Sequence, residues 1–203
     1  MKLYYIPGAC SLASHILLRE VGADFELEAV DPSTGLTESG QKFAAVNSKG
    51  YVPALELDSG EVLSEGAAVL QFIADSAPDQ IELPAPGTVS RARLQEYLNY
   101  TASELHKAFS PLFAKSSDES AKADARAKVA SKFDYLEALL ADGRQYLVDE
   151  RFSPADAYLF VVAGWARVQQ IDLGRWPHLS GFVSRIAERP TVLAAIQAEG
   201  IGS

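Results

Sequence analysis

The feature that most constrains the fold is a change of hydrophobic periodicity about 80 residues into the chain. Before it, short apolar runs typical of strands alternate with runs whose apolar residues recur at helical spacing. After it, every apolar pattern is helical. A stiff linker separates the two patterns, because it contains Pro78, Pro84, Pro86 and Gly87. We therefore predict an α/β domain over residues 1–79, a linker over 80–88 and an all-helical domain over 89–203.

The front domain is predicted to follow the order β-α-β-α-β-β-α. Its expected strands are residues 1–6, 26–30, 52–58 and 61–63, and its expected helices lie near residues 12–21, 41–46 and 67–74. Ser59-Gly60 is a turn dipeptide, so the last two strands form an antiparallel hairpin. The rear domain is predicted to be a bundle with helices over residues 90–113, 121–140, 154–170, 177–188 and 191–198.

The charge distribution argues against nucleic acid as a partner. The net charge is -9, with 4 basic and 12 acidic residues in positions 1–80 against 14 and 15 in the remainder. Such an acidic front repels a phosphate backbone. No apolar run reaches the roughly 18 residues of a membrane-spanning helix, and residues 1–6 lack the layout of a signal peptide. We therefore expect a cytoplasmic protein that binds neither nucleic acid nor membranes.

Cysteine and histidine content limits the chemistry further. The single cysteine, Cys10, excludes an internal disulfide framework, and the three histidines show no metal-ligand spacing. Cys10 lies in Pro7-Gly-Ala-Cys-Ser11, directly after the first strand and at the start of the first helix. Amides and the helix dipole at such a place favour a thiolate. A cysteine packed in the core is the alternative, but the strand-to-helix junction favours a thiol that faces a cleft.

Two backbone features of the front domain suit a peptide ligand. Pro53 opens the third strand and supplies no amide donor, so the amide and carbonyl of Val52 are available to an extended peptide. Ser64-Glu-Gly66 precedes a helix, where the amides favour a carboxylate and Glu65 favours an ammonium. A γ-glutamyl group carries both charges. Each feature also has a purely structural explanation, because proline often starts an edge strand and an acidic residue often caps a helix.

The first helix of the rear domain carries a polar stripe. Its members are spaced by four, three and four residues, and they are Asn99, Ser103, His106 and Ser110. This spacing places all of them on one narrow face. The other faces are predicted to form core through Tyr97, Leu98, Leu105 and Leu112. Most such stripes are simply solvated, yet a histidine on the first helix after the linker also suits a wall that faces the front domain.

Together these segments resemble a cytosolic glutathione S-transferase. The likeness to the bacterial beta class is closest in residues 1–5, Pro7-Gly-Ala-Cys-Ser-Leu-Ala-Ser-His15, Glu104-Leu-His-Lys107 and Ala187-Glu-Arg-Pro190. The similarity covers essentially the whole chain. It implies the glutathione transferase fold, with an α/β thioredoxin-like N-terminal domain and an all-α helical-bundle C-terminal domain. Ser153-Pro-Ala-Asp156 matches the buried N-capping box of this family, which stabilises the fold.

The resemblance implies a site for reduced glutathione, as a co-substrate rather than a tightly bound cofactor, and no metal. Cys10 and His106 are the implied catalytic residues, with Cys10 beside the glutathione sulfur. The implied contacts from the front domain are Cys10, Val52, Pro53, Glu65 and Gly66. The implied contacts from the rear helix, part of them across a homodimer interface, are Asn99, Ser103, Glu104, Leu105, His106 and Lys107.

Two positions depart from the family pattern. Related sequences have a ligand-contacting lysine at the position of Gly35, so this chain lacks one expected salt bridge. Ser48 replaces a proline. The electrophile is expected to meet apolar walls, for which the candidates are Tyr5, Phe109, Phe113 and Trp165.

Three functions are therefore compared. The first is conjugation, in which the glutathione thiolate attacks hydrophobic electrophiles, a detoxification reaction. The second is a glutathione-dependent thiol-disulfide reductase or peroxidase, in which Cys10 cycles through a mixed disulfide. The third is a non-catalytic binding or interaction module, because this fold also serves such roles. The presence of Cys10, Glu65 and His106 argues against the third function.

Overall fold

The computed structural model describes residues 1–201 and divides into two compact units. The first unit combines Met1–Pro84 with the segment from Glu188 onward, and the second comprises Ala85–Ala187. The sequence analysis assigned everything after residue 88 to the rear domain. The last helix clusters with the front instead, because α9 (Pro190–Ala198) packs against α1 (Ser11–Glu20).

A five-stranded mixed sheet forms the centre of the first unit. Its strands are β1 (Lys2–Tyr5), β2 (Glu26–Asp31), β3 (Leu36–Thr37), β4 (Ala54–Glu56) and β5 (Val62–Ser64), in the order β3-β2-β1-β4-β5. β1 and β2 run parallel, with Leu3 opposite Leu27, and the other three pairs are antiparallel. The parallel crossover and the hairpin are as predicted, whereas the two-residue β3 was not expected.

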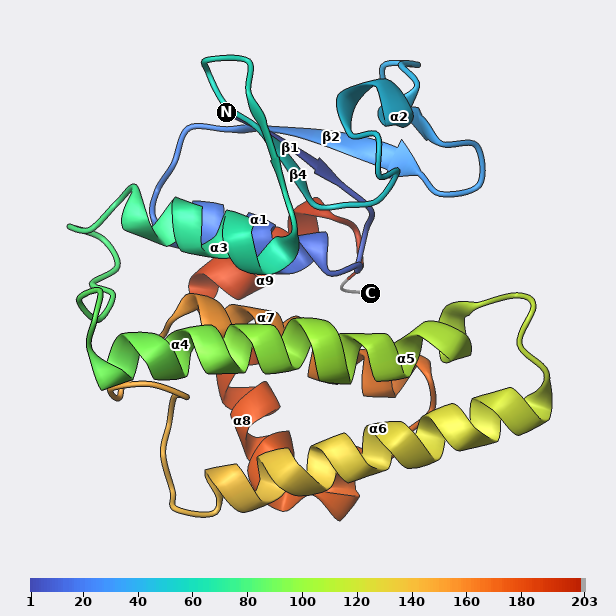
Figure 1. Cartoon of the computed structure of the whole chain (residues 1–203), viewed down its shortest axis with the longest axis vertical. Coiled ribbons are helices and arrows are strands. Elements are labelled where there is room, and N and C mark those ends of the chain that lie inside the picture. The colour runs from blue at the N-terminus through green and yellow to red at the C-terminus, as the bar shows by residue number, and fades with distance from the viewer. Residues whose placement is uncertain (202–203) are drawn as a thin grey trace. The chain divides into compact units, whose positions relative to one another are not determined.

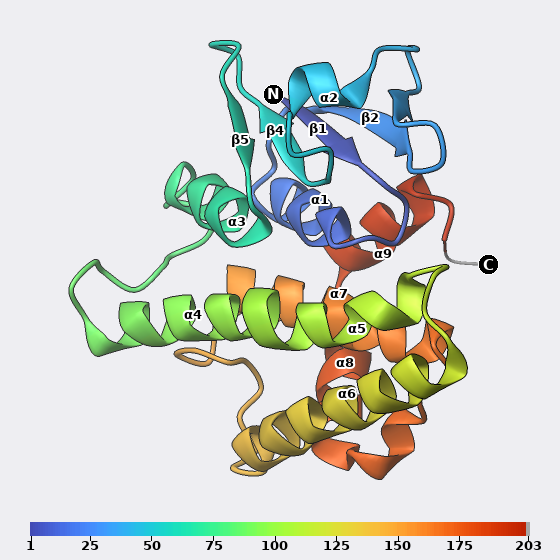
Figure 2. The ribbon, with the colours of Figure 1, turned by 45° about the vertical axis from the view of Figure 1, so that its right-hand side comes forward.

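Helices cover both faces of this sheet. α1 and α3 (Gly66–Asp75) lie side by side on one face, and α2 (Phe43–Val46) lies on the other (Figures 1 and 2). The larger core is fully buried and contains Leu3, Ile16, Leu17, Leu55, Leu70 and Ile73. A smaller cluster, formed by Tyr4, Val30, Phe43, Val52 and Ala54, packs under α2. This smaller core anchors the segment that leads into β4.

The second unit consists of helices. They are α4 (Val89–Tyr100), a π-helical turn (Thr101–Leu105), α5 (His106–Phe113), α6 (Glu119–Leu140), α7 (Pro154–Val168), a 3₁₀ turn (Leu173–Arg175) and α8 (Pro177–Ala187). α4 and α5 continue each other as one rod, and α6 returns beside α5 (Figure 1). α7 packs against α4 and α8, and most of its residues are buried. None of the helices within residues 1–201 is long and apolar enough to cross a membrane.

The expected capping box at the start of α7 is present. The Asp156 carboxylate accepts hydrogen bonds from the Ser153 amide (2.8 Å), the Ser153 hydroxyl (2.6 Å) and the Leu147 amide (2.8 Å). Asp156 is fully buried, and this burial raises the pKa of its carboxyl to about 6. The box therefore ties the loop before α7 to the helix that forms the centre of the unit.

Candidate functional site

Cys10 lies where the chain leaves β1 and enters α1. It is the N-cap residue of α1, its side chain is partly exposed, and its Sγ donates to the carbonyl oxygen of Val52 at 3.4 Å. The thiol is therefore not enclosed by the core. α1 begins here because Gly8 adopts a φ of 71°, which favours glycine, and reverses the chain after the strand.

Val52 presents its backbone beside this thiol. Its carbonyl receives the Cys10 thiol, and the Val52–Pro53 peptide bond is cis. The amide of Val52 donates to no group within residues 1–201, because Val52 stands before β4 and outside the sheet ladder. Its side chain is held in the small core under α2. An extended peptide that accepts from this amide gains a donor that the fold itself leaves unused.

Glu65 is the second part of the front half of the site. It is the N-cap residue of α3 and has φ 72°, an uncommon backbone conformation for a residue other than glycine. Its carboxylate accepts from Lys49 Nζ at 2.6 Å and from the Tyr51 hydroxyl at 2.8 Å. Both hydrogen bonds to the carboxylate raise the pKa of the Lys49 ammonium and of the Tyr51 phenol. The carboxylate is therefore ionised and already attracts an ammonium group.

The N-terminus of α3 follows directly. The amides of Gly66 and Ala67 are the first two of the helix and have no acceptor within the described residues, and the side chain of Glu65 does not cap them. Two amide donors thus stand beside one carboxylate. A group that bears a carboxylate and an ammonium on one carbon matches this combination.

Gly35 and Tyr5 complete the candidates of the first unit. Gly35 lies in the exposed turn between β2 and β3, with φ 70° and its amide bonded to the Asp31 carbonyl at 2.8 Å. It therefore offers no side-chain contact to a ligand. Tyr5 is only 9% exposed, and its ring lies 6.3 Å from that of His15. Burial, then the Glu199 and Glu38 carboxylates, raise the pKa of Tyr5, which leaves little of its surface for an electrophile.

In the second unit, the π-helical turn changes the expected polar stripe. The turn interrupts the rod between Tyr100 and His106, and a wider turn rotates everything that follows it. Asn99, Ser103 and Ser110 are exposed, and the Ser103 hydroxyl donates to the Asn99 carbonyl at 2.8 Å. His106 instead packs against α7, so the four residues do not form one exposed stripe. The predicted core positions Tyr97, Leu98, Leu105 and Leu112 are all buried.

His106 lies against two aromatic rings of α7. Its Nδ1 is 3.0 Å from the Tyr158 hydroxyl, and its ring centroid is 4.7 Å from that of Trp165. Burial, and to a lesser degree the Lys107 ammonium, lower the pKa of His106 to about 4. The imidazole is therefore neutral near pH 7. It offers one N–H donor and one acceptor rather than a positive charge.

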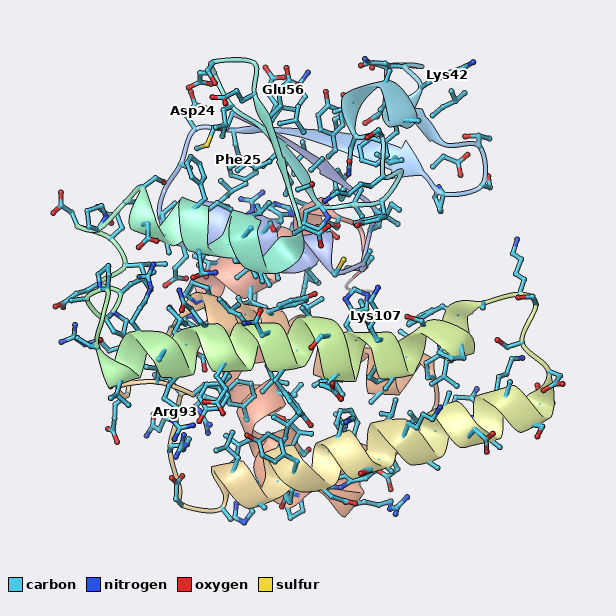
Figure 3. The ribbon with its side chains drawn as sticks, viewed as in Figure 1. Asp24, Phe25, Lys42, Glu56, Arg93 and Lys107 are labelled. Atoms are coloured by element: carbon cyan, nitrogen blue, oxygen red, sulfur yellow. The ribbon has the colours of Figure 1, made fainter. Side chains whose placement is uncertain are left out.

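The neighbours of His106 differ in what they can contact. Glu104 is exposed and forms an ion pair with Lys132 of α6 at 2.6 Å. Leu105 is fully buried, so only its backbone is available to a ligand. Lys107 is exposed and stands out from the start of α5 (Figure 3). Of the three, Lys107 has the side chain that is best placed to meet a solute.

The aromatic candidates of this unit form a cluster around Trp165. Phe109 and Phe113 lie at ring-centroid distances of 5.7 and 5.3 Å from it. Phe109 is fully buried and also packs on Phe133, so it belongs to the core and does not line a pocket, contrary to the sequence analysis. Trp165 is 8% exposed, whereas Phe113 is 48% exposed. Phe113 thus remains the aromatic candidate with free surface.

A separate cavity of about 500 Å³ lies between α4, the end of α6 and the loop before α7. Tyr97, Tyr135 and Arg144 line it, and none of the predicted site residues does. The Arg144 guanidinium is bound to Asp142, at 2.7 Å for the shortest contact. Within residues 1–201, no group of three or more His, Cys, Asp or Glu side chains is arranged to hold a metal ion.

Three residues of this arrangement were missed in the sequence. Lys49 and Tyr51 bind Glu65, and Tyr158 contacts His106. Lys49 and Tyr51 flank Gly50 just before Val52-Pro53, so their position beside the site could have marked them. Tyr158 carries no comparable signal, because it lies in an apolar helix and resembles any core aromatic residue.

Family models match both parts of the chain. The model for the N-terminal domain of glutathione S-transferases matches residues 1–75, and the model for the C-terminal domain matches residues 100–190. The chain is 47% identical over 201 residues to glutathione S-transferase GstA of Escherichia coli O157:H7, which covers 99% of this chain and 100% of that one. It is 37% identical over 209 residues to glutathione S-transferase GST-4.5 of Xanthomonas campestris pv. campestris, with 99% and 100% coverage.

Solved structures agree with these relatives. A bacterial beta-class glutathione S-transferase of Sphingomonas chungbukensis superposes with a TM-score of 0.96 at 47% identity, over 99% of this chain and 100% of that one. A sphingomonad glutathione S-transferase in complex with glutathione superposes with a TM-score of 0.95 at 48% identity, over the full length of both chains. The protein is therefore a member of the glutathione S-transferase family, of the bacterial beta class.

Proposed function

We propose that the protein conjugates reduced glutathione to electrophilic, mostly apolar small molecules. The observation that carries this proposal is the set of donors and charges on the first unit. The Val52 amide, the first two amides of α3 and the Glu65 carboxylate match the backbone and the γ-glutamyl end of glutathione. The sphingomonad relative, whose structure holds glutathione, supports the same ligand for this chain.

In this proposal each group has one task. The Val52 backbone pairs with the cysteinyl residue of glutathione, and the amides of Gly66 and Ala67 receive the γ-glutamyl carboxylate. Glu65 shares its carboxylate between Lys49 and the γ-glutamyl ammonium. Cys10 then meets the glutathione sulfur, because its Sγ already contacts the carbonyl that the ligand lies beside.

The reaction itself is a nucleophilic substitution or addition. The glutathione thiol gives its proton to solvent, and Cys10 and the neutral His106 donate hydrogen bonds that lower the energy of the resulting thiolate. The thiolate forms a carbon–sulfur bond with the electrophile, and a leaving group departs with its electron pair where one is present. Phe113 and Trp165 are the proposed apolar contacts for the electrophile, and Asn99, Ser103, Glu104 and Lys107 keep their proposed place around glutathione.

The proposal also includes a homodimer in the cytoplasm, with glutathione as a co-substrate and no tightly bound cofactor. The most direct test is turnover of a chloronitrobenzene together with retention on immobilised glutathione. We expect both. A protein that shows neither behaves as a binding module of another kind, and the proposal is then wrong. Sedimentation velocity at micromolar concentration checks the dimer separately.

A second function is favoured by the exposure of Cys10. A partly exposed thiol at a helix N-terminus suits exchange with a glutathione disulfide, in which Cys10 forms a mixed disulfide and a second glutathione releases it. Cys10→Ala separates the two reactions. We expect disulfide reduction to be abolished and conjugation to fall by about tenfold, the size of one lost transition-state hydrogen bond. Ser110→Ala, an exposed change on α5, serves as the control for both assays.

A further inference from the structure

A buried polar chain links the end of α9 to the loop before Cys10. The side chain of Glu199, the C-cap residue of α9, is completely buried. Its Oε1 lies 2.9 Å from Nδ1 of His15 on α1, and its Oε2 accepts the amide of Gly8 at 2.9 Å. Gly8 is two residues before Cys10. Three segments far apart in the sequence thus meet at one carboxylate.

The direction of each hydrogen bond in this chain is determined. Arg19 Nε donates to Nε2 of His15 at 2.8 Å, and an arginine nitrogen can only donate. Nε2 is therefore an acceptor, so Nδ1 carries the hydrogen and donates to Glu199. The Arg19 charge and the Glu199 charge lie at opposite ends of one neutral imidazole. Burial of this carboxylate is tolerated because both of its oxygens are bonded.

Packing holds the imidazole in this direction. The ring of Phe25, from the segment before β2, meets the His15 ring edge-on at 5.7 Å, and the Arg19 guanidinium lies 5.9 Å above the same ring (Figure 3 labels Phe25). His15 itself is fully buried. The imidazole cannot turn without leaving one of its two partners unbonded, so it passes the position of Arg19 on to Glu199.

Gly8 is the place where this chain reaches the loop. The rest of the loop is bonded locally, since the Ala9 amide donates to the Ile6 carbonyl at 3.0 Å and Ser11 Oγ bonds the Ile6 backbone. Glu199 adds a tie from outside the loop. The side chain of Ile201 also packs over this point, 3.8 Å from where a Cβ on Gly8 would lie. The C-terminal segment therefore sets the position of the loop from which Cys10 extends.

We propose that Glu199 and His15 are positioning residues for Cys10. They hold the Gly8 amide, and through it they fix the direction in which the Cys10 thiol meets the Val52 carbonyl. The effect on glutathione chemistry rests on the proposed function above. The effect on the reactivity of the thiol does not, since it concerns Cys10 alone.

The chain offers a matched control for a merely structural role. Glu20, at the other end of α1, also joins α1 to the C-terminal segment, through the Arg189 guanidinium and the Thr191 hydroxyl. Its loss weakens the same pair of helices but leaves the loop at Cys10 untouched. Comparison of Glu199→Ala with Glu20→Ala therefore separates positioning of the thiol from docking of α9.

The experiment measures alkylation of Cys10 by iodoacetamide at pH values high enough that the rate no longer rises. There the rate reports exposure and freedom of the thiolate rather than its fraction. We expect Glu199→Ala to speed alkylation by roughly fivefold or more, because the loop opens more often, and Glu20→Ala to stay near the wild-type rate. Equal rates in the two variants would overturn the proposal. If Glu199→Ala does not fold, Glu199→Gln decides, since its amide nitrogen opposes the Nδ1 hydrogen of His15.

Kinetics add a second readout. We expect Glu199→Ala to lower kcat for conjugation by about tenfold or more, as a misplaced group does, with KM for glutathione changed much less. Glu199→Gln should lie between the two, because its oxygen still accepts the Gly8 amide. A rise in KM alone contradicts the positioning role. If the wild type shows no turnover, the proposed function fails, and the alkylation rates still test the inference about Cys10.

Discussion

The two units prepare for function in different ways. In the first, the candidate binding groups are mostly backbone amides, held at a strand end and a helix start by the fold around them. In the second, they are side chains on a rod whose direction changes at a π-helical turn, and its one fully buried carboxylate serves folding. The difference teaches that losses of stability and losses of ligand affinity should separate between the two units.

The largest effect is expected from Asp156→Ala in the second unit. It leaves the Ser153 and Leu147 amides without their acceptor inside the protein, so we expect a loss of about 3 kcal/mol in the free energy of unfolding. Asp118→Ala, which removes an exposed cap of α6, should lose only about 1 kcal/mol. Urea unfolding measures both. Equal losses would mean that the box is no more important than an ordinary cap.

Glu65→Gln tests the first unit. The substitution keeps the size of the side chain but removes the charge that attracts an ammonium, so we expect glutathione affinity to fall by about tenfold or more. The free energy of unfolding should change little, because the Lys49–Glu65 pair is exposed. Isothermal titration calorimetry gives the affinity. Glu61→Gln on the adjacent hairpin is the control, and a similar drop there would point to general charge rather than a specific contact.

His106 predicts a pH dependence of stability. Its folded-state pKa of about 4 lies below the ordinary histidine value of about 6.5, so the unfolded chain binds the extra proton first as pH falls. Stability should therefore be lost between about pH 6.5 and pH 4. His106→Gln should reduce this loss, whereas the same change at the exposed His178 should not. Urea midpoints at pH 4.5 and 7 provide the comparison, and an unchanged pH profile in His106→Gln rules out this origin.

The smallest effect is expected from the ion pair between the π-helical turn and α6. Glu104 and Lys132 are both partly exposed, so Lys132→Ala should cost roughly 0.5 kcal/mol of stability, and less at high salt. Thermal unfolding at two salt concentrations checks this. A much larger loss would mean that the pair holds the π-helical turn in place.

The front half of the site was predictable because its groups are backbone groups. Pro53 and the start of the helix at Gly66 state where amides are left unpaired, whatever the surrounding side chains do. Cys10 at the strand-to-helix junction follows the same logic. Glu199 could not be found in this way, because it lies 191 residues from Gly8 and only the folded chain brings the two together.

The rear half depended on helical register, which a single turn can change. The spacing of Asn99, Ser103 and His106 assumed one uninterrupted α-helix, and the π-helical turn moved His106 against α7. Phe109 was misjudged for a related reason, because an aromatic residue on an amphipathic helix is equally compatible with core and with a pocket wall. The apolar positions were predicted correctly, since burial of Leu98 and Leu112 satisfies the periodicity on both sides of the turn.

A crystal soaked with reduced glutathione tests the central claim most directly. We expect the cysteinyl backbone to pair with Val52, the γ-glutamyl carboxylate to lie on the amides of Gly66 and Ala67, and the ligand sulfur to lie within contact distance of Cys10 Sγ. Glutathione bound elsewhere, or absent at millimolar concentration from a lattice that leaves this surface open, contradicts the claim.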